Sequence, residues 1–143
     1  MEIRPITPRY AVSPQITVED VPAIAQAGFV KVICNRPNAE VPSDMQSDAI
    51  GEAVRAAGLE YVVLELTHQT MTPENVARQR DMAEACGGPV LAYCASGTRC
   101  SVVWALGQCD RMSTDDILSA TTNAGYQLEN LRPALDHMRK AVD

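Results

Sequence analysis

The sequence lacks the features that mark several large classes of protein. Its apolar runs are broken within about ten residues, whereas roughly 20 are needed to cross a membrane. The opening residues, MEIRPITPRY, contain no apolar core of a secretory signal. A formal net charge of −6 disfavours binding to nucleic acid or to an anionic membrane. We therefore expect a cytoplasmic protein that binds neither membranes nor nucleic acids.

Metal-binding and cofactor-binding motifs are also missing. Five cysteines are present, but none forms a CxxC pair and none lies in a cysteine-histidine cluster with zinc-binding spacing. An odd number of cysteines without a secretory signal indicates reduced thiols. Neither the glycine-rich phosphate loop nor the dinucleotide-binding fingerprint occurs. The sequence thus implies no metal and no organic cofactor.

The order of strand-like and helix-like segments predicts the fold class. The 143 residues contain no repeat and no long linker, which predicts one domain over residues 1–143. Strands are predicted at 9–13 (an edge strand), 29–35, 61–67 and 89–94. Helices are predicted at 17–28, 47–58, 73–86, 99–110, 114–124 and 127–142. This alternation predicts an α/β fold, with a mostly parallel central sheet of four to five strands and helices on both faces.

The stretch YCASGTRC, residues 93–100, carries the clearest chemical signal. Cys94 ends an apolar strand and precedes a predicted helix, whose N-terminus offers free N–H groups and a partial positive charge. Arg99 adds a planar, permanently charged fork for two oxygen atoms. The pattern predicts a Cys94 nucleophile with a lowered pKa. The anion would be held by Arg99 and by the backbone amides of residues 95–100, which are Ala95, Ser96, Gly97, Thr98, Arg99 and Cys100.

Three further residues near this loop have two interpretations each. Arg36 follows the strand at 29–35 and is either a second contact for the anion or part of a salt bridge. His68, in the loop after the next strand, either lines the mouth of the pocket or is solvated. Cys100 is interpreted first as a packed core residue, with a resolving thiol for an oxidised or persulfidated Cys94 as the alternative.

Three segments together resemble a known family. YCASGTRCSVVWAL, with VICNRPNAE upstream and AGYQLENLRPAL downstream, is similar to the beta-lactamase hydrolase-like, phosphatase-like family, whose members are also labelled sulfur transferases. The resemblance extends from about residue 3 to residue 137. It implies a tyrosine/dual-specificity-phosphatase-like fold and a possible association with a persulfide-oxidising enzyme. It also implies site roles for Cys94 as the nucleophile, Gly97 and Arg99 in the loop, and Asn35, Arg36 and Pro37 in the upstream turn.

Two departures from the tyrosine phosphatase pattern bear on the chemistry. Four residues, rather than five, separate Cys94 from Arg99, and four is the loop length of rhodanese-type sulfurtransferases. Cys100 stands where the phosphatases and this family usually have serine or threonine. In addition, the loop LTHQTMTPEN at 66–75 contains no aspartate that could protonate a leaving group, and His68 is its early titratable candidate.

These observations lead to three hypotheses. The leading one is a cysteine-dependent sulfurtransferase with rhodanese-like chemistry, in which Cys94 takes sulfane sulfur from a small anionic donor (thiosulfate or a persulfide) and passes it to a thiol acceptor. The second is a tyrosine/dual-specificity-type phosphatase, a hydrolase that acts through a phosphocysteine intermediate. The third is a non-catalytic module that uses the loop to bind an anion.

Overall fold

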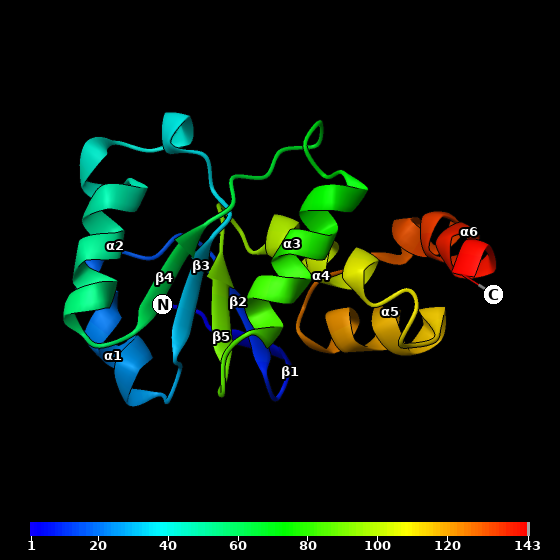
Figure 1. The fold of residues 1–143 in the computed structure, drawn as a ribbon, viewed down its shortest axis with the longest axis horizontal. Coiled ribbons are helices and arrows are strands. Elements are labelled where there is room, and N and C mark those ends of the chain that lie inside the picture. Colours follow the sequence, from blue (N-terminus) through cyan, green and yellow to red (C-terminus); the bar gives the residue numbers. More distant parts are fainter. Residues whose placement is uncertain (143) are drawn as a thin grey trace.

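A five-stranded sheet forms the centre of the computed structural model, which describes residues 1–142 (Figure 1). Its strands lie in the order β1-β2-β5-β3-β4, and β2, β5, β3 and β4 run parallel to one another, whereas β1 is antiparallel to β2. The carboxyl ends of the four parallel strands therefore meet at one edge of the sheet. The strand bounds are β1 Arg4–Thr7, β2 Tyr10–Ser13, β3 Lys31–Cys34, β4 Glu60–Val63 and β5 Val90–Tyr93.

Helices cover both faces of the sheet. One face is covered by α1 (Val21–Gln26) and α2 (Ser47–Ala56), and the other by α3 (Pro73–Glu84) and α4 (Thr98–Gly107). Outside α4 lie α5 (Thr114–Asn123) and α6 (Arg132–Val142) (Figure 1). This arrangement confirms the predicted α/β class. Within residues 1–142, no helix has the length and apolarity needed to cross a membrane.

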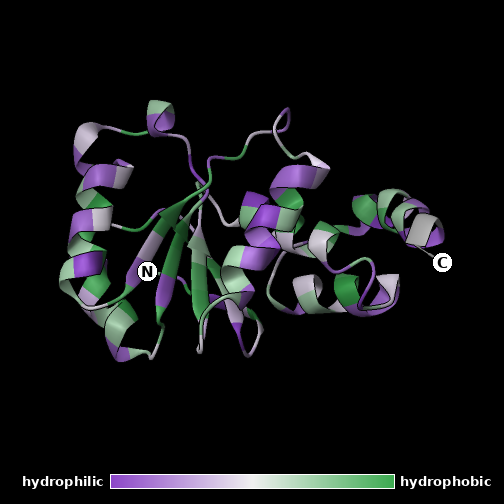
Figure 2. Ribbon diagram, viewed as in Figure 1, coloured by the Kyte–Doolittle hydropathy of each residue, from purple (hydrophilic) through white to green (hydrophobic). Residues whose placement is uncertain are grey.

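The core is divided by the sheet into two layers. On β5, Val90 and Ala92 pack in the cluster beneath α4 and α5, whereas Leu91 and Tyr93 pack beneath α1 and α2. All four β5 side chains are buried, as expected for a parallel strand that is covered on both faces. In Figure 2 the central strands are mostly hydrophobic, whereas the helices carry hydrophilic residues along their length as well.

The N-terminal part of the sheet differs from the sequence-based prediction. Strand β1 was not predicted, and it makes β2 an interior strand rather than an edge strand. Pro5 lies within β1 and has no N–H to donate, so it is compatible only with an edge position. The residues around Pro5 have the local pattern of a loop, because this segment becomes a strand only through its antiparallel pairing with β2.

Two other boundaries also differ. The strand predicted at 61–67 ends at Val63, although the chain continues alongside the β3 end, where the Leu64 N–H donates to the Cys34 carbonyl (2.9 Å). The last helix begins at Arg132 rather than at residue 127. Tyr126 and Leu128 turn into the core, and a 3₁₀ turn at Glu129–Leu131 connects them to α6.

Candidate active site

The loop between β5 and α4 depends on a glycine. Gly97 has a φ of +93°, in the left-handed region that favours glycine. A Cβ atom at this position would overlap the hydroxyl of Tyr126. That hydroxyl donates a hydrogen bond to the Ser96 carbonyl (2.9 Å), while the Ser101 hydroxyl donates to the Gly97 carbonyl (2.8 Å). The loop is therefore held in its curled form from both sides.

Cys94 lies where the curl of the loop directs N–H groups at its sulfur. The Gly97 N–H donates to the Cys94 Sγ at 3.1 Å. The pKa of Cys94 is lowered to about 5, chiefly because the Cys100 thiol donates a hydrogen bond to its sulfur. The backbone N–H groups of Cys100, Ser96 and Gly97 act in the same direction, and burial opposes them. A pKa of about 5 favours the thiolate form of Cys94 at neutral pH, in the direction expected from the sequence.

Cys100 lies in the first helical turn of α4 and is fully buried. Burial and the neighbouring Cys94 sulfur raise its pKa well above the ordinary value, so it remains a protonated thiol. The predicted packing of Cys100 in the core is confirmed, since it belongs to the main hydrophobic cluster. Its thiol is nevertheless the largest cause of the lowered pKa of Cys94.

Arg99 is held by Glu40, whose pairing with Arg99 was not predicted. Its Nη1 and Nη2 donate to the two carboxylate oxygens of Glu40 at 2.9 and 2.8 Å, and Nη1 also donates to the Leu66 carbonyl at 3.0 Å. Hydrogen bonds from Arg99 and then from Arg36 lower the pKa of Glu40. Three of the five guanidinium N–H groups are thus used, and within residues 1–142 Nε–H and one Nη2–H have no oxygen acceptor. These two lie along one edge of the guanidinium, the arrangement that binds two oxygen atoms of one anion.

A cavity of about 390 Å³ opens over this loop. It is lined by the loop residues Ala95, Ser96, Thr98 and Arg99, by Thr67, His68 and Met71 after β4, and by Glu40 and Val102. His68 therefore lies at the pocket, as one of its two interpretations proposed. Arg36 is not among the lining residues, because its guanidinium turns to Glu40 (3.1 Å) and to the Gln15 side chain (3.3 Å). It supports Glu40 rather than facing the cavity. In the part of the chain that the structure describes, no cluster of histidine, cysteine and carboxylate side chains could hold a metal ion.

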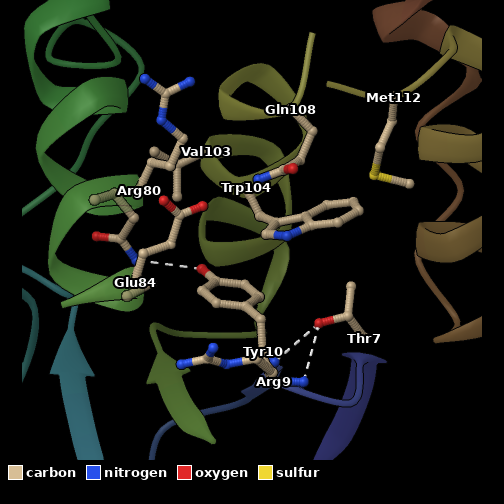
Figure 3. Close-up of a pocket in the computed structure, with 11 residues that line it drawn as sticks. Thr7, Arg9, Tyr10, Arg80, Glu84, Val103, Trp104, Gln108 and Met112 are labelled. Atoms are coloured by element: carbon tan, nitrogen blue, oxygen red, sulfur yellow. Dashed lines mark hydrogen bonds between the residues drawn. The ribbon is translucent and has the colours of Figure 1, made fainter. Parts of the chain in front are cut away.

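A buried polar network fixes the first turn of α4 from the opposite side. The Tyr10 hydroxyl donates to the Cys100 carbonyl (2.8 Å) and accepts from the Gln79 amide (3.2 Å). Gln79 and Asn35 exchange two hydrogen bonds of 2.9 Å, and Asn35 also donates to the Leu64 carbonyl (2.8 Å). Tyr10 forms one wall of a second cavity, of about 430 Å³, together with Trp104 and Arg80 (Figure 3). The lining of this larger cavity includes none of the loop residues 94–99, so it is separate from the candidate active site.

The sequence comparisons agree with this geometry. Residues 2–111 match the family described as beta-lactamase hydrolase-like protein, phosphatase-like domain. The chain belongs to this family. The beta-lactamase hydrolase-like protein of Agrobacterium fabrum is 32% identical over 148 residues, which cover 96% of this chain and 34% of that protein. The chain thus spans about a third of the length of the curated relatives it matches.

Solved structures of similar proteins confirm the fold. A candidate phosphatase from Neisseria meningitidis Z2491 is 34% identical, with a TM-score of 0.86 over 97% of this chain and 99% of that one. TpbA of P. aeruginosa, in complex with pTyr, has a TM-score of 0.66 at 16% identity, over 99% of this chain and 90% of that one. The expected tyrosine/dual-specificity-phosphatase-like fold is therefore confirmed. The comparisons support a phosphatase-like domain and give no support to the leading hypothesis of a sulfurtransferase.

Proposed function

We propose that this protein is a cysteine-based phosphatase that hydrolyses aryl phosphate monoesters, of which phosphotyrosine is the natural representative. The observation that carries the proposal is the combination of the Cys94 thiolate with the open edge of the Arg99 guanidinium on one loop. The similarity to a candidate phosphatase over nearly the whole chain supports the same reaction class. Family membership alone does not fix the substrate.

The first chemical step transfers the phosphoryl group to Cys94. The phosphate oxygens bind to the loop amides and to Nε and Nη2 of Arg99 while the Cys94 sulfur attacks phosphorus. The S–P bond forms as the P–O bond to the aryl group breaks, and the aryl oxygen leaves with the electron pair. Glu40 is a poor proton donor because Arg99 and Arg36 hold it ionised. The titratable residues in the lining are Glu40, Arg99 and His68. Because Arg99 binds the phosphate and Glu40 is ionised, we assign to His68 the transfer of a proton to the leaving oxygen.

The second step releases phosphate. A water molecule attacks phosphorus, the S–P bond breaks, and inorganic phosphate and a proton are produced as the thiolate is regenerated. A thiolate of low pKa is a good leaving group, and the S–H of Cys100 donates to the same sulfur. Cys100 thereby stabilises the leaving thiolate, as a hydroxyl at this position does in related phosphatases.

Sulfur transfer is the second candidate function because two observations favour it. Only four residues separate Cys94 from Arg99, and the loop at 66–75 contains no aspartate. A thiolate or sulfite leaving group needs no general acid. An experiment on the proposed function must therefore offer the protein both kinds of substrate.

The test measures inorganic phosphate released from p-nitrophenyl phosphate and from phosphotyrosine. We expect activity in the wild type, a loss of at least about 10³-fold in Cys94→Ser, and no change in Cys109→Ser, which alters a thiol far from the loop. His68→Ala should slow phosphotyrosine more than p-nitrophenyl phosphate, because p-nitrophenol leaves without protonation. The proposal is wrong if no phosphate appears while thiosulfate adds one sulfur atom to Cys94 that cyanide removes.

A further inference from the structure

The larger of the two cavities has the size of a small-molecule site. The walls of this α3–α4 cavity come from the turn between β1 and β2, from α3, and from α4 with the segment that follows it (Figure 3). Its volume of about 430 Å³ lies within the range of roughly 300–1,000 Å³ that is typical of such sites. No residue of its lining takes part in the proposed phosphatase reaction, so its occupant is a separate question.

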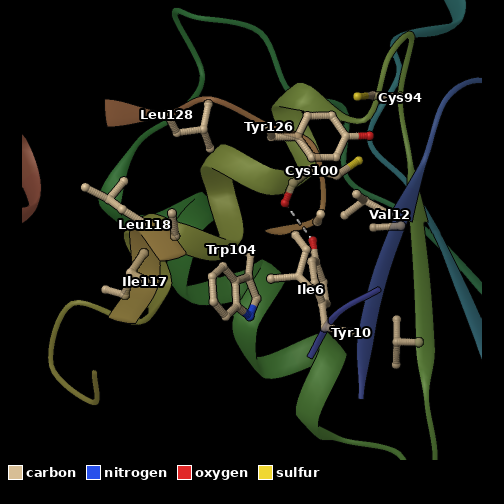
Figure 4. Packing of buried hydrophobic residues seen from close by; sticks show 14 of the residues in the cluster. Ile6, Tyr10, Val12, Cys94, Cys100, Trp104, Ile117, Leu118, Tyr126 and Leu128 are labelled. Carbon is tan, nitrogen blue, oxygen red and sulfur yellow. Dashed lines mark hydrogen bonds between the residues drawn. The ribbon is translucent and has the colours of Figure 1, made fainter. Parts of the chain in front are cut away.

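Two aromatic rings form one wall of the α3–α4 cavity. Trp104 and Tyr10 stack with their ring centroids 6.3 Å apart and an angle of 22° between the ring planes. Most of each ring is buried in the main hydrophobic cluster (Figure 4), and the small uncovered part lines the cavity. The Tyr10 hydroxyl is fixed between the Cys100 carbonyl and the Gln79 amide, so this wall is rigid. A rigid aromatic wall favours a planar aromatic ligand, which loses little conformational freedom on binding.

Two N–H groups of these walls lack an acceptor. The indole N–H of Trp104 makes no hydrogen bond in the part of the chain that the structure describes, although a buried indole N–H usually has a partner (Figure 3). The buried Nε of Arg80 has no partner among the described residues either. Leaving a buried N–H unpaired is costly, and in native proteins water or a ligand generally supplies the acceptor. The cavity therefore favours a ligand that carries hydrogen-bond acceptors.

The charges of the walls leave one positive group without a counter-charge. The Arg80 and Glu84 side chains each form an ion pair with a residue outside the lining. Arg9 is exposed at the rim, and its guanidinium donates to the Cys86 carbonyl (2.7 Å) but to no carboxylate within the described residues. Its remaining N–H groups match the two oxygens of a carboxylate. The acceptor that the rim favours is therefore anionic.

We propose that the α3–α4 cavity is a binding site for a small aromatic carboxylate. The ring of the ligand lies against Trp104 and Tyr10, and its carboxylate binds to Arg9 at the rim. A second acceptor on the ring, such as a nitro or carbonyl oxygen, accepts the hydrogen bond from the Trp104 indole N–H. Binding is non-covalent and uses neither Cys94 nor Arg99, so it does not rest on the proposed phosphatase function.

The test uses Trp104, the single tryptophan of the chain, whose emission comes from the wall of this cavity. The protein is titrated with 4-nitrobenzoate, whose ring quenches indole emission, and calorimetry gives the stoichiometry. We expect saturable quenching with a Kd of about 1 mM or below and one ligand per chain. The uncharged 4-nitrobenzamide and the non-aromatic cyclohexanecarboxylate should each bind at least about 5-fold more weakly in calorimetry, because each lacks one of the two groups that the site recognises.

Three variants locate the bound ligand. Arg9→Gln should raise the Kd about 5-fold, whereas Arg78→Gln, the matched control, removes an exposed arginine of α3 outside the lining and should leave it unchanged. Arg99→Ala should also leave the Kd unchanged, because that guanidinium lines the other cavity.

The wild-type titration decides the proposal even if a variant does not fold. Quenching that does not saturate by about 10 mM, or equal Kd values for the carboxylate and the amide, overturns it. Loss of binding in Arg99→Ala also overturns it, because the ligand would then occupy the candidate active site. None of these readouts needs turnover, so a protein that binds 4-nitrobenzoate here but releases no phosphate would refute the phosphatase function and leave this inference standing.

Discussion

The contribution of Cys100 to the reactivity of Cys94 can be tested by Cys100→Ala. The pKa of Cys94 lies at about 5, and the hydrogen bond from the Cys100 thiol is its largest cause. A hydrogen bond to a charged group contributes about 1.5–3 kcal/mol, and one pKa unit corresponds to about 1.4 kcal/mol. Because S–H is a weak donor, the lower part of that range applies. Removing the thiol should therefore raise the pKa of Cys94 by about one unit.

The measurement is the rate of iodoacetamide alkylation between pH 4 and pH 9, followed on the Cys94 peptide by mass spectrometry. Such a rate rises with the fraction of thiolate, so its midpoint gives the pKa. Cys100→Ser is the matched control, because its hydroxyl keeps a donor at the same place and should leave the midpoint near that of the wild type. An unchanged midpoint in Cys100→Ala would refute the reasoning and assign the lowered pKa to the backbone N–H groups.

Three further predictions concern the loop and its surroundings. Glu40→Gln should lower kcat/KM for aryl phosphates about 5-fold, because a partly exposed charged pair that orients Arg99 contributes about 1 kcal/mol. Unchanged kinetics would contradict this. Gly97→Ala should lower the free energy of unfolding by at least about 1–2 kcal/mol in urea titrations, because φ is positive at this position and the new Cβ meets the Tyr126 hydroxyl. Adding Tyr126→Phe should recover part of the loss. Equal unfolding midpoints for wild type and Gly97→Ala would exclude this strain. The pKa of Cys94 is lowered in the folded state, so the thiolate stabilises the protein fully above the unfolded pKa of about 8.5, and this stabilisation is lost as the pH falls through about 5. As the pH rises between these values, the free energy of unfolding of the wild type should therefore increase relative to that of Cys94→Ser by up to about 1.4 kcal/mol per pH unit. A constant difference between the two proteins would show that Cys94 is not a thiolate in the folded state.

The loop could be predicted from sequence because its determinants are contiguous. Cys94, Gly97 and Arg99 lie within six residues, and each has a local reason for its position: the end of an apolar strand, a left-handed turn and the start of a helix. The parallel sheet was also predictable, because alternating strand and helix patterns leave few other solutions.

The partners of the loop could not be predicted in the same way. Glu40 is 59 residues from Arg99 in sequence, and a carboxylate in a proline-rich loop gives no local sign of a distant partner. One topological signal was available, because Glu40 follows β3 and so lies near the sheet edge that carries the loop. Tyr126 was missed for a related reason. It lies between the helices predicted at 114–124 and 127–142, and its conformation is determined by burial of its ring and by the contact with Ser96, which no local pattern indicates.

The pairing of Arg99 with Glu40 also determines how strongly the site attracts anions from solution. The groups around the cavity include two negative charges, on Cys94 and Glu40, and two positive ones, on Arg99 and Arg36, so they cancel beyond a few ångströms. A site whose local charges cancel exerts little long-range attraction on an anion. Chloride and other simple anions therefore gain little by entering. Under the proposed function, a ligand is retained only if its oxygens match the open guanidinium edge and the loop amides, so the site would select its ligand by shape at short range.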